Sequence, residues 1–136
     1  MPPKTKAFVL DSWTVIAFFE DEPAGKKIAD LIANAHEDGI PIYMTVVNVG
    51  EVWYITAREI SEEVANNIVK ELNDLKIEFV DANWEITQNA ARFKSKNRMS
   101  YADCYAAALT RIKNGVLVTG DTEFKAIEAQ IDIQWV

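Results

Sequence analysis

Four acidic residues each stand alone in a segment of the chain that is otherwise uncharged and largely apolar. They are Asp11 in residues 7–19, Glu51 in residues 43–57, Asp103 in residues 101–110 and Asp121 in residues 115–122. None of these segments contains a lysine or arginine that could pair with the acid. A buried carboxylate without a partner is costly or keeps its proton. If the four acids converge, the missing charge is most simply a hard divalent cation, which prefers oxygen ligands.

Each acid also has a local structural interpretation. Asp103 follows Ser100 by three residues, and this Ser-x-x-Asp spacing is typical of a helix-capping arrangement. Asp11 and Asp121 could each cap the helical segment that follows. Glu51 could be a first-turn acid that faces the helix dipole. Because the pattern repeats in four segments, we favour a shared function over four separate structural roles.

Short apolar runs alternate with helical patterns along the chain and predict the elements that position these acids. We expect strands at residues 7–10, 40–47, 77–80, 115–119 and 131–136. The helical patterns run from Pro23 to Gly39, over 49–57, from the cap residue Ser61 to Leu75, and over 83–94, 100–113 and 123–129. After Asp11, residues 14–19 continue apolar. This alternation predicts one α/β domain over residues 1–136 with a mainly parallel sheet.

Two of the acids directly follow predicted strands. Asp11 comes after the first strand and Asp121 after the fourth. Parallel α/β sheets place their ligand crevices at the carboxyl ends of the strands. The fold class therefore predicts that at least these two acids lie at a binding crevice.

Composition excludes several classes of protein. The 136 residues include 14 basic and 21 acidic side chains, a net charge of −7, so a broad basic surface for nucleic acid is absent. One cysteine and one histidine exclude an intrachain disulfide and a Cys/His structural zinc site. No apolar run approaches 18 residues, and the opening residues 1–6 lead straight into the first strand without a secretory signal. We expect a soluble cytoplasmic protein that does not contact a membrane.

The chain resembles PIN-domain ribonucleases of the VapC type, the toxins of VapBC toxin–antitoxin pairs. The matching stretches occur in the family's order and at its usual separations, and together they span the chain nearly end to end. They are VLDS at residues 9–12, TVVNVGEV at 45–52, SYADCYAAA at 100–108 and VTGDTEF at 118–124. The chain departs from the family at Trp13, where a polar residue is usual.

The resemblance implies a PIN-like three-layer sandwich, in which a mainly parallel five-stranded sheet is flanked by helices. It implies that Asp11, Glu51, Asp103 and Asp121 cluster at one edge of the sheet as catalytic residues and ligands for Mg²⁺ or Mn²⁺. The implied reaction is hydrolysis of single-stranded or looped RNA. A metal held by carboxylates can activate water and neutralise charge that builds on the phosphate and the leaving oxygen.

The resemblance also implies partners: a homodimer, and a VapB-type antitoxin whose C-terminal segment crosses the acidic crevice. A net charge of −7 suits an inhibitor that carries arginine or lysine into that crevice.

A second group of residues could contact substrate or support the metal ligands. Ser12 and Thr119 could bring hydroxyls close to the metal or phosphate, or could form local backbone bonds at strand ends. Lys94, Lys96 and Arg98 form the densest basic stretch and could contact RNA phosphates, or could be a solvated break between helices.

Other activities fit the residues less well. A haloacid-dehalogenase phosphatase needs a second acid two residues after the first, where this chain has Trp13. A receiver domain needs an acidic pair and a functional lysine, and neither is evident. His36 is the only histidine and lies at a predicted helix end, which suits a dipole partner better than a catalytic acid or base. The main alternative is a PIN-like protein-binding domain with little or no nuclease activity.

Overall fold

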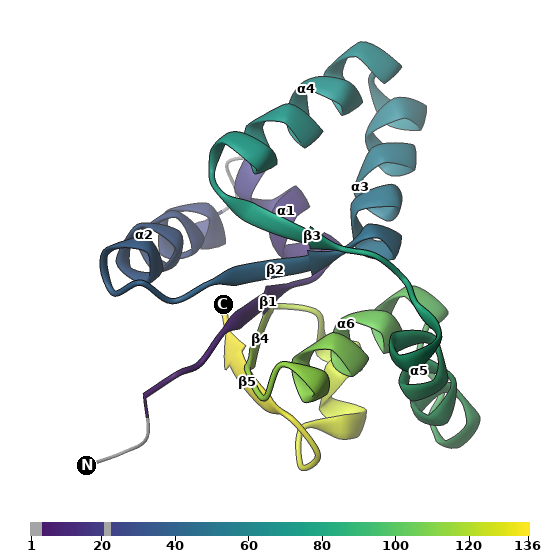
Figure 1. Ribbon diagram of the computed structural model, residues 1–136. Helices are drawn as coiled ribbons and strands as arrows, with labels where there is room; N and C mark the ends of the chain where they lie inside the picture. The colour runs from purple at the N-terminus through teal and green to yellow at the C-terminus, as the bar shows by residue number, and fades with distance from the viewer. Residues whose placement is uncertain (1–3, 21–22) are drawn as a thin grey trace.

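Five strands alternate with helices along the chain, as the sequence predicts (Figure 1). The computed structural model describes residues 4–20 and 23–136, so residues 1–3 of the opening segment lie outside it. The strands are β1 (Phe8–Leu10), β2 (Ile42–Thr45), β3 (Ile77–Val80), β4 (Val116–Thr119) and β5 (Asp132–Trp135). The helices are α1 (Ser12–Phe19), α2 (Pro23–Glu37), α3 (Val46–Glu59), α4 (Glu62–Asp74), α5 (Trp84–Lys96), α6 (Tyr101–Ile112) and the short 3₁₀ helix η1 (Thr122–Ile127).

All neighbouring strands pair in parallel, in the order β3-β2-β1-β4-β5. The chain builds outward from β1 through β2 to β3 and then returns to the other side of β1 with β4. This reversal between β1 and β4 is a topological switch point, where open α/β sheets form ligand crevices. Leu10 is in register with Val118, so the next residues, Asp11 just beyond β1 and Thr119 at the end of β4, lie side by side.

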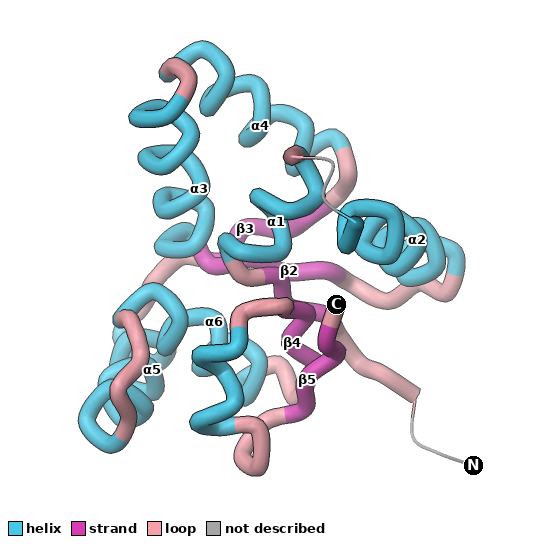
Figure 2. The backbone as a smooth tube through the Cα atoms, turned by 180° about the vertical axis from the view of Figure 1, so that it is seen from behind, coloured by secondary structure: helices cyan, strands magenta, loops and turns pink. Residues whose placement is uncertain are grey.

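Helices cover both faces of the sheet, which confirms the predicted three layers. Successive strand residues point to opposite faces. Val9 and Leu117 accordingly pack in a core with residues of α5, α6 and η1. Leu10 and Val118 pack in a second core with residues of α1, α2, α3 and α4. The same division is visible from behind in Figure 2.

The ends of the elements follow from side-chain caps. The predicted strand at 40–47 is too long, because Thr45 already caps α3: its side chain accepts a hydrogen bond from the Asn48 backbone amide. Val46 and Val47 are therefore helical. The apolar residues 14–19 belong to a helix, α1, because the Asp11 side chain caps its start. Ser61 caps α4 as the sequence predicts.

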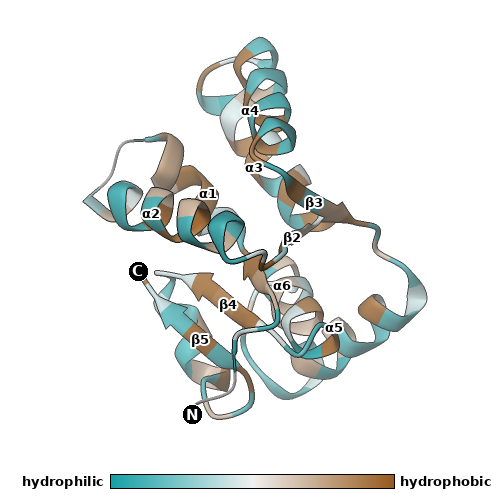
Figure 3. Ribbon diagram, turned by 60° about the vertical axis from the view of Figure 1, so that its left-hand side comes forward, coloured by the Kyte–Doolittle hydropathy of each residue, from teal (hydrophilic) through white to brown (hydrophobic). Residues whose placement is uncertain are grey.

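The helices differ in how much of their surface is buried. Figure 3 shows hydrophilic and hydrophobic residues alternating around the outer helices α2 and α4, whereas much of α6 is hydrophobic. Residues 103–110 of α6 are all buried, so this helix lies in the core. Within residues 4–20 and 23–136, every helix is too short or too polar to cross a bilayer.

Candidate active site

An acidic cleft of about 260 Å³ opens at the carboxyl edge of the sheet. Its lining comes from α1, α3, the start of α6, the loop after β4 and the start of η1. These residues are Ser12, Trp13, Ile16, Glu51, Ile55, Ser100, Asp103, Asp121 and Glu123. Three of the four solitary acids predicted from the sequence therefore line one cleft, and the fourth, Asp11, lies below it.

Asp11 is fully buried and holds two elements of the site together. Its Oδ1 accepts a hydrogen bond of 2.9 Å from the Thr14 amide, and its Oδ2 accepts one of 2.5 Å from the Thr119 hydroxyl. The Thr119 oxygen in turn accepts a hydrogen bond from the Asp121 amide at 3.0 Å. Burial raises the pKa of Asp11 to about 6, although these hydrogen bonds oppose the rise. Asp11 is both a helix cap and a member of the acidic group.

Asp103 has the most strongly perturbed carboxyl group of the cleft. Its side chain comes from the first turn of α6, and the residue is only 5% exposed. Burial, followed by the nearby charges of Asp121, Glu123 and Asp11, raises its pKa to about 8. The Ser100 hydroxyl lowers the pKa, but this is the smallest of the effects. The carboxylate is thus held where its negative charge is poorly compensated.

Glu123 is a fifth acid of the site that the sequence analysis did not single out. One carboxylate oxygen from each of Asp103, Asp121 and Glu123 can lie within 4.8 Å of the others. Glu123 shares its segment with Asp121 and Lys125, so it does not stand out as a solitary charge. The available signal was its position in the stretch VTGDTEF, which carries the resemblance.

The capping interpretation of Asp103 holds only in part. The Ser100 hydroxyl accepts a hydrogen bond from the Asp103 amide, as in a capping box. The reciprocal bond is made by another residue, because the Ser100 amide donates to the Glu123 carboxylate. The Asp103 carboxylate therefore does not close the capping box, and Glu123 joins η1 to the start of α6.

Glu51 enters the cleft from the second turn of α3, so its interpretation as a first-turn acid is wrong. The Ser12 hydroxyl donates a hydrogen bond to the Glu51 carboxylate and links α1 to α3. Asn48, also missed by the sequence analysis, is fully buried beneath this region. Its side-chain amide donates to the Ala102 carbonyl at 3.0 Å and so holds α6 against α3.

No lysine or arginine lies within salt-bridge distance of these acids in the described residues. The ion pairs found there are Lys26–Asp30 and Lys70–Asp74, both on exposed helix faces. The predicted basic stretch is absent from the lining of the cleft. Lys94 donates to the Met99 carbonyl at 2.6 Å and so stabilises the α5–α6 turn. Lys96 and Arg98 are exposed in or next to that turn.

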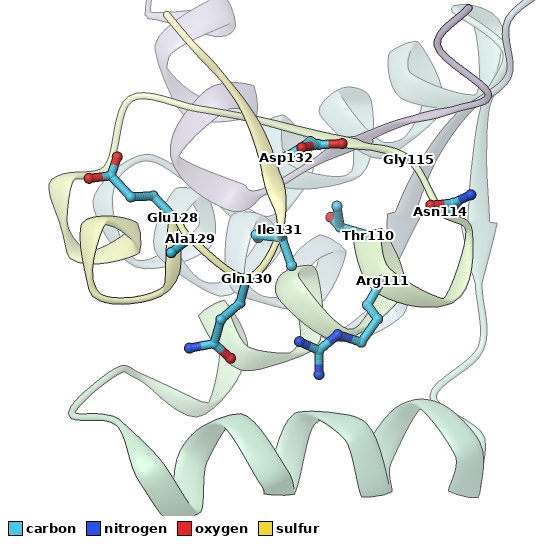
Figure 4. A pocket seen from close by; sticks show the side chains of 9 residues that line it. All are labelled: Thr110, Arg111, Asn114, Gly115, Glu128, Ala129, Gln130, Ile131 and Asp132. Atoms are coloured by element: carbon cyan, nitrogen blue, oxygen red, sulfur yellow. The ribbon is translucent and has the colours of Figure 1, made fainter. Parts of the chain in front are cut away.

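A second hollow lies at the opposite edge of the sheet (Figure 4). It is formed by the end of α6, the turn before β4 and the start of β5, with Arg111 and Glu128 among its side chains. His36 also lies away from the acids, at the end of α2, with its Nε2 2.6 Å from the Leu75 carbonyl oxygen. Neither feature adds a group to the acidic cleft.

Comparison with known proteins identifies this arrangement. The family model described as PIN domain matches residues 8–130. The chain belongs to the PIN domain family. No curated protein matches its sequence.

Solved structures similar to this PIN domain include VapC toxins. VapC20 of Mycobacterium tuberculosis, described as a Sarcin-Ricin loop cleaving toxin, has 14% identity and a TM-score of 0.71, with 92% of this chain and 96% of that chain covered. The DNA-bound VapBC2 of Rickettsia felis has 15% identity and a TM-score of 0.73, with 94% and 97% covered. The DNA-bound VapBC of Salmonella typhimurium has 16% identity and a TM-score of 0.73, with 94% and 96% covered. At these identities the likeness concerns the fold.

The donor set of this PIN domain suits a hard divalent cation. Asp103, Asp121 and Glu123 supply only carboxylate oxygens, the ligand type that Mg²⁺ and Mn²⁺ prefer. Asp11 lies behind them, and its charge also raises the pKa of Asp103. A cation at the cleft would compensate a group of acids for which the described residues provide no basic partner.

Proposed function

We propose that this PIN domain is a divalent-metal-dependent ribonuclease and the toxin of a type II toxin–antitoxin pair. The observation that carries the proposal is the buried Asp103 carboxyl group, whose neighbours Asp121 and Glu123 are acids rather than bases. Such a group is costly as a structural device and useful as a metal ligand. The PIN family membership and the likeness to VapC toxins support the same activity.

The side chains of the cleft would have different roles. Asp103, Asp121 and Glu123 would hold Mg²⁺ or Mn²⁺, and Asp11 would add negative charge from below. When bound, the cation supplies an activated water and neutralises charge on the scissile phosphate. Thr119 fixes the Asp11 carboxylate and the Asp121 backbone in one network, so the acids are positioned before substrate arrives. The Ser12–Glu51 hydrogen bond holds a further acid at the α1–α3 side of the cleft.

We expect the purified protein to cleave RNA in Mg²⁺ or Mn²⁺ and to stop cleaving when EDTA is added. A panel of single-stranded and stem-loop RNAs, analysed on denaturing gels, measures this directly. Excess metal added back after EDTA should restore cleavage, which separates metal removal from damage to the protein. Undiminished cleavage in EDTA would contradict the metal dependence. Absence of cleavage with every RNA and both metals would favour the protein-binding alternative.

We further propose that the partner is a VapB-type antitoxin that binds an apolar groove beside the cleft. This groove of about 300 Å³ lies between α1, α3 and α4, and it shares Ile16 and Ile55 with the acidic cleft. Its apolar lining is edged by Glu20, Glu59 and Glu71. A partner segment with an apolar face and basic flanks would complement it and could extend a cation into the cleft. The similar solved structures that are VapBC complexes support this choice of partner.

The antitoxin to test is the product of a small reading frame beside this one, co-expressed with the toxin. We expect Ile60→Asp to weaken its binding by at least about tenfold, which is about 1.4 kcal/mol. Ile60 is 68% exposed at the groove, so the change should leave the fold intact. Trp84→Asp is the matched control, because Trp84 is equally exposed but lies on α5, across the sheet. Calorimetry measures affinity, and light scattering tests the expected homodimer. Separate elution of wild-type protein and antitoxin would contradict the partnership.

A further inference from the structure

Trp13 forms an aromatic wall of the acidic cleft. It is the second residue of α1, is half-buried and lines the cleft with Asp103 and Asp121. Its six-membered ring lies directly against Gly120, the residue before Asp121. A Cβ atom at Gly120 would come within 2.1 Å of the ring atom Cη2. The absence of a side chain at Gly120 therefore allows the indole to reach across from α1 to the loop that carries Asp121.

The polar edge of this indole is its N–H group. Its N–H makes no hydrogen bond with any described residue, whereas the Trp53 N–H donates to Asn66 at 3.0 Å. Every buried side-chain nitrogen or oxygen in the described part of the chain has a partner. Trp13 thus gives the cleft an aromatic surface and a hydrogen-bond donor that no described residue uses.

The lining of the cleft also limits how RNA could be held there. It contains acids, hydroxyls and apolar side chains but no lysine or arginine. Phosphate contacts by basic side chains, the usual source of nucleic-acid affinity, are therefore unavailable within the cleft itself. Stacking on an aromatic side chain does not depend on charge and accepts any base. Trp13 is the aromatic side chain among the lining residues.

We propose that Trp13 binds the RNA substrate by stacking one unpaired base beside the phosphate that is cut. The proposal rests on the ribonuclease function proposed above. It implies that the substrate is a flexible segment, because a base must leave its own stack to reach the indole. Trp13 is then a substrate-binding residue of the cleft.

Substitution of Trp13 separates stacking from simple packing on Gly120. Trp13→Phe keeps an aromatic ring and should retain kcat/KM within about threefold, whereas Trp13→Leu fills the space without a ring. We expect Trp13→Leu and Trp13→Ala to lower kcat/KM by about 5- to 150-fold, mainly by raising KM. This is the loss in affinity expected when the aromatic side chain under one stacked base is removed. Trp84→Ala is the matched control. The rise in melting temperature with Mn²⁺ should be unchanged in all variants if the acids keep their positions.

A series of abasic substrates tests the contact itself. In a short RNA with a mapped cut, each nucleotide near the cut is replaced in turn by an abasic one. We expect one abasic position to lower the kcat/KM of the wild-type protein by about the same factor as Trp13→Leu lowers it on intact RNA. On that one substrate, Trp13→Leu should lower kcat/KM hardly any further, because both changes remove the same contact.

Two results would overturn the proposal. Equal kcat/KM for wild type and Trp13→Leu on intact RNA would show that no base depends on the ring. If the losses in kcat/KM from Trp13→Leu and from the abasic nucleotide were additive at every position, Trp13 would have a packing role only. Absence of RNA cleavage by the wild-type protein would instead refute the proposed function, and this inference with it, before any variant is compared.

Discussion

Asp103→Asn should lower metal-dependent RNA cleavage by at least about a hundredfold, the scale at which disturbed metal-ligand shells lose activity. The amide has nearly the same size as the carboxyl group but carries no charge, so a cation loses one of its anionic ligands. Asp103 lies with Asp121 and Glu123 around a common point in the cleft, so the loss should not be replaced by another residue. Initial rates in saturating Mn²⁺, with a single RNA, measure the effect.

Asp132→Asn is the matched control for this experiment. Asp132 is exposed at the start of β5, at the edge of the sheet opposite the acids, and should keep full activity. Asp11→Asn tests the deeper acid: asparagine still caps a helix, so activity should fall while the fold remains. Wild-type rates in both Asp103→Asn and Asp11→Asn would contradict the proposed catalytic role of the acids.

Without metal, Asp103→Asn should raise the melting temperature by several degrees at pH 8.5 and by much less at pH 5. The pKa of Asp103 is raised from 3.8 to about 8 in the folded protein, so the folded state binds more protons than the unfolded state between these values. The contribution of Asp103 to stability is therefore fully present below about pH 3.8 and is lost as the pH rises to about 8. Each unit of pKa shift corresponds to about 1.4 kcal/mol. Asparagine does not ionise and avoids this loss.

Mn²⁺ should stabilise the wild type more than it stabilises Asp103→Asn. A cation that binds only the folded state adds about 2.7 kcal/mol at a hundred times its dissociation constant. The wild type should gain this stabilisation, and Asp103→Asn should gain much less. Melting curves in EDTA and in Mn²⁺, at pH 5 and 8.5, with Asp132→Asn as control, give the full comparison. A variant that melts lower in EDTA and gains as much from Mn²⁺ as the wild type would assign Asp103 a capping role.

The order of strands and helices could be predicted because it depends on local patterns. Apolar runs bounded by turns gave the strands, and cap residues such as Ser61 gave helix starts. The local pattern failed where one residue served two elements. Thr45 ends β2 and caps α3, and Asp11 directly follows β1 and caps α1, so the apolar residues beyond them are helical although they resemble a strand.

The sequence by itself determined which carboxylates are unusual, because a charge alone in an apolar segment is visible without a structure. It also placed Asp11 and Asp121 at strand ends, and the pairing of β1 with β4 makes these ends neighbours. Only the tertiary structure decided what joins them. Asp103 reaches the cleft because Asn48 and Glu123 anchor the start of α6, through contacts spanning 54 and 23 residues of the chain. Helical and strand periodicity report which side of an element is apolar, and they carry no information about which distant element it meets. For that reason the grouping of Glu123 with Asp103 and Asp121, and the contact between Trp13 and Gly120, could be found only in the folded chain.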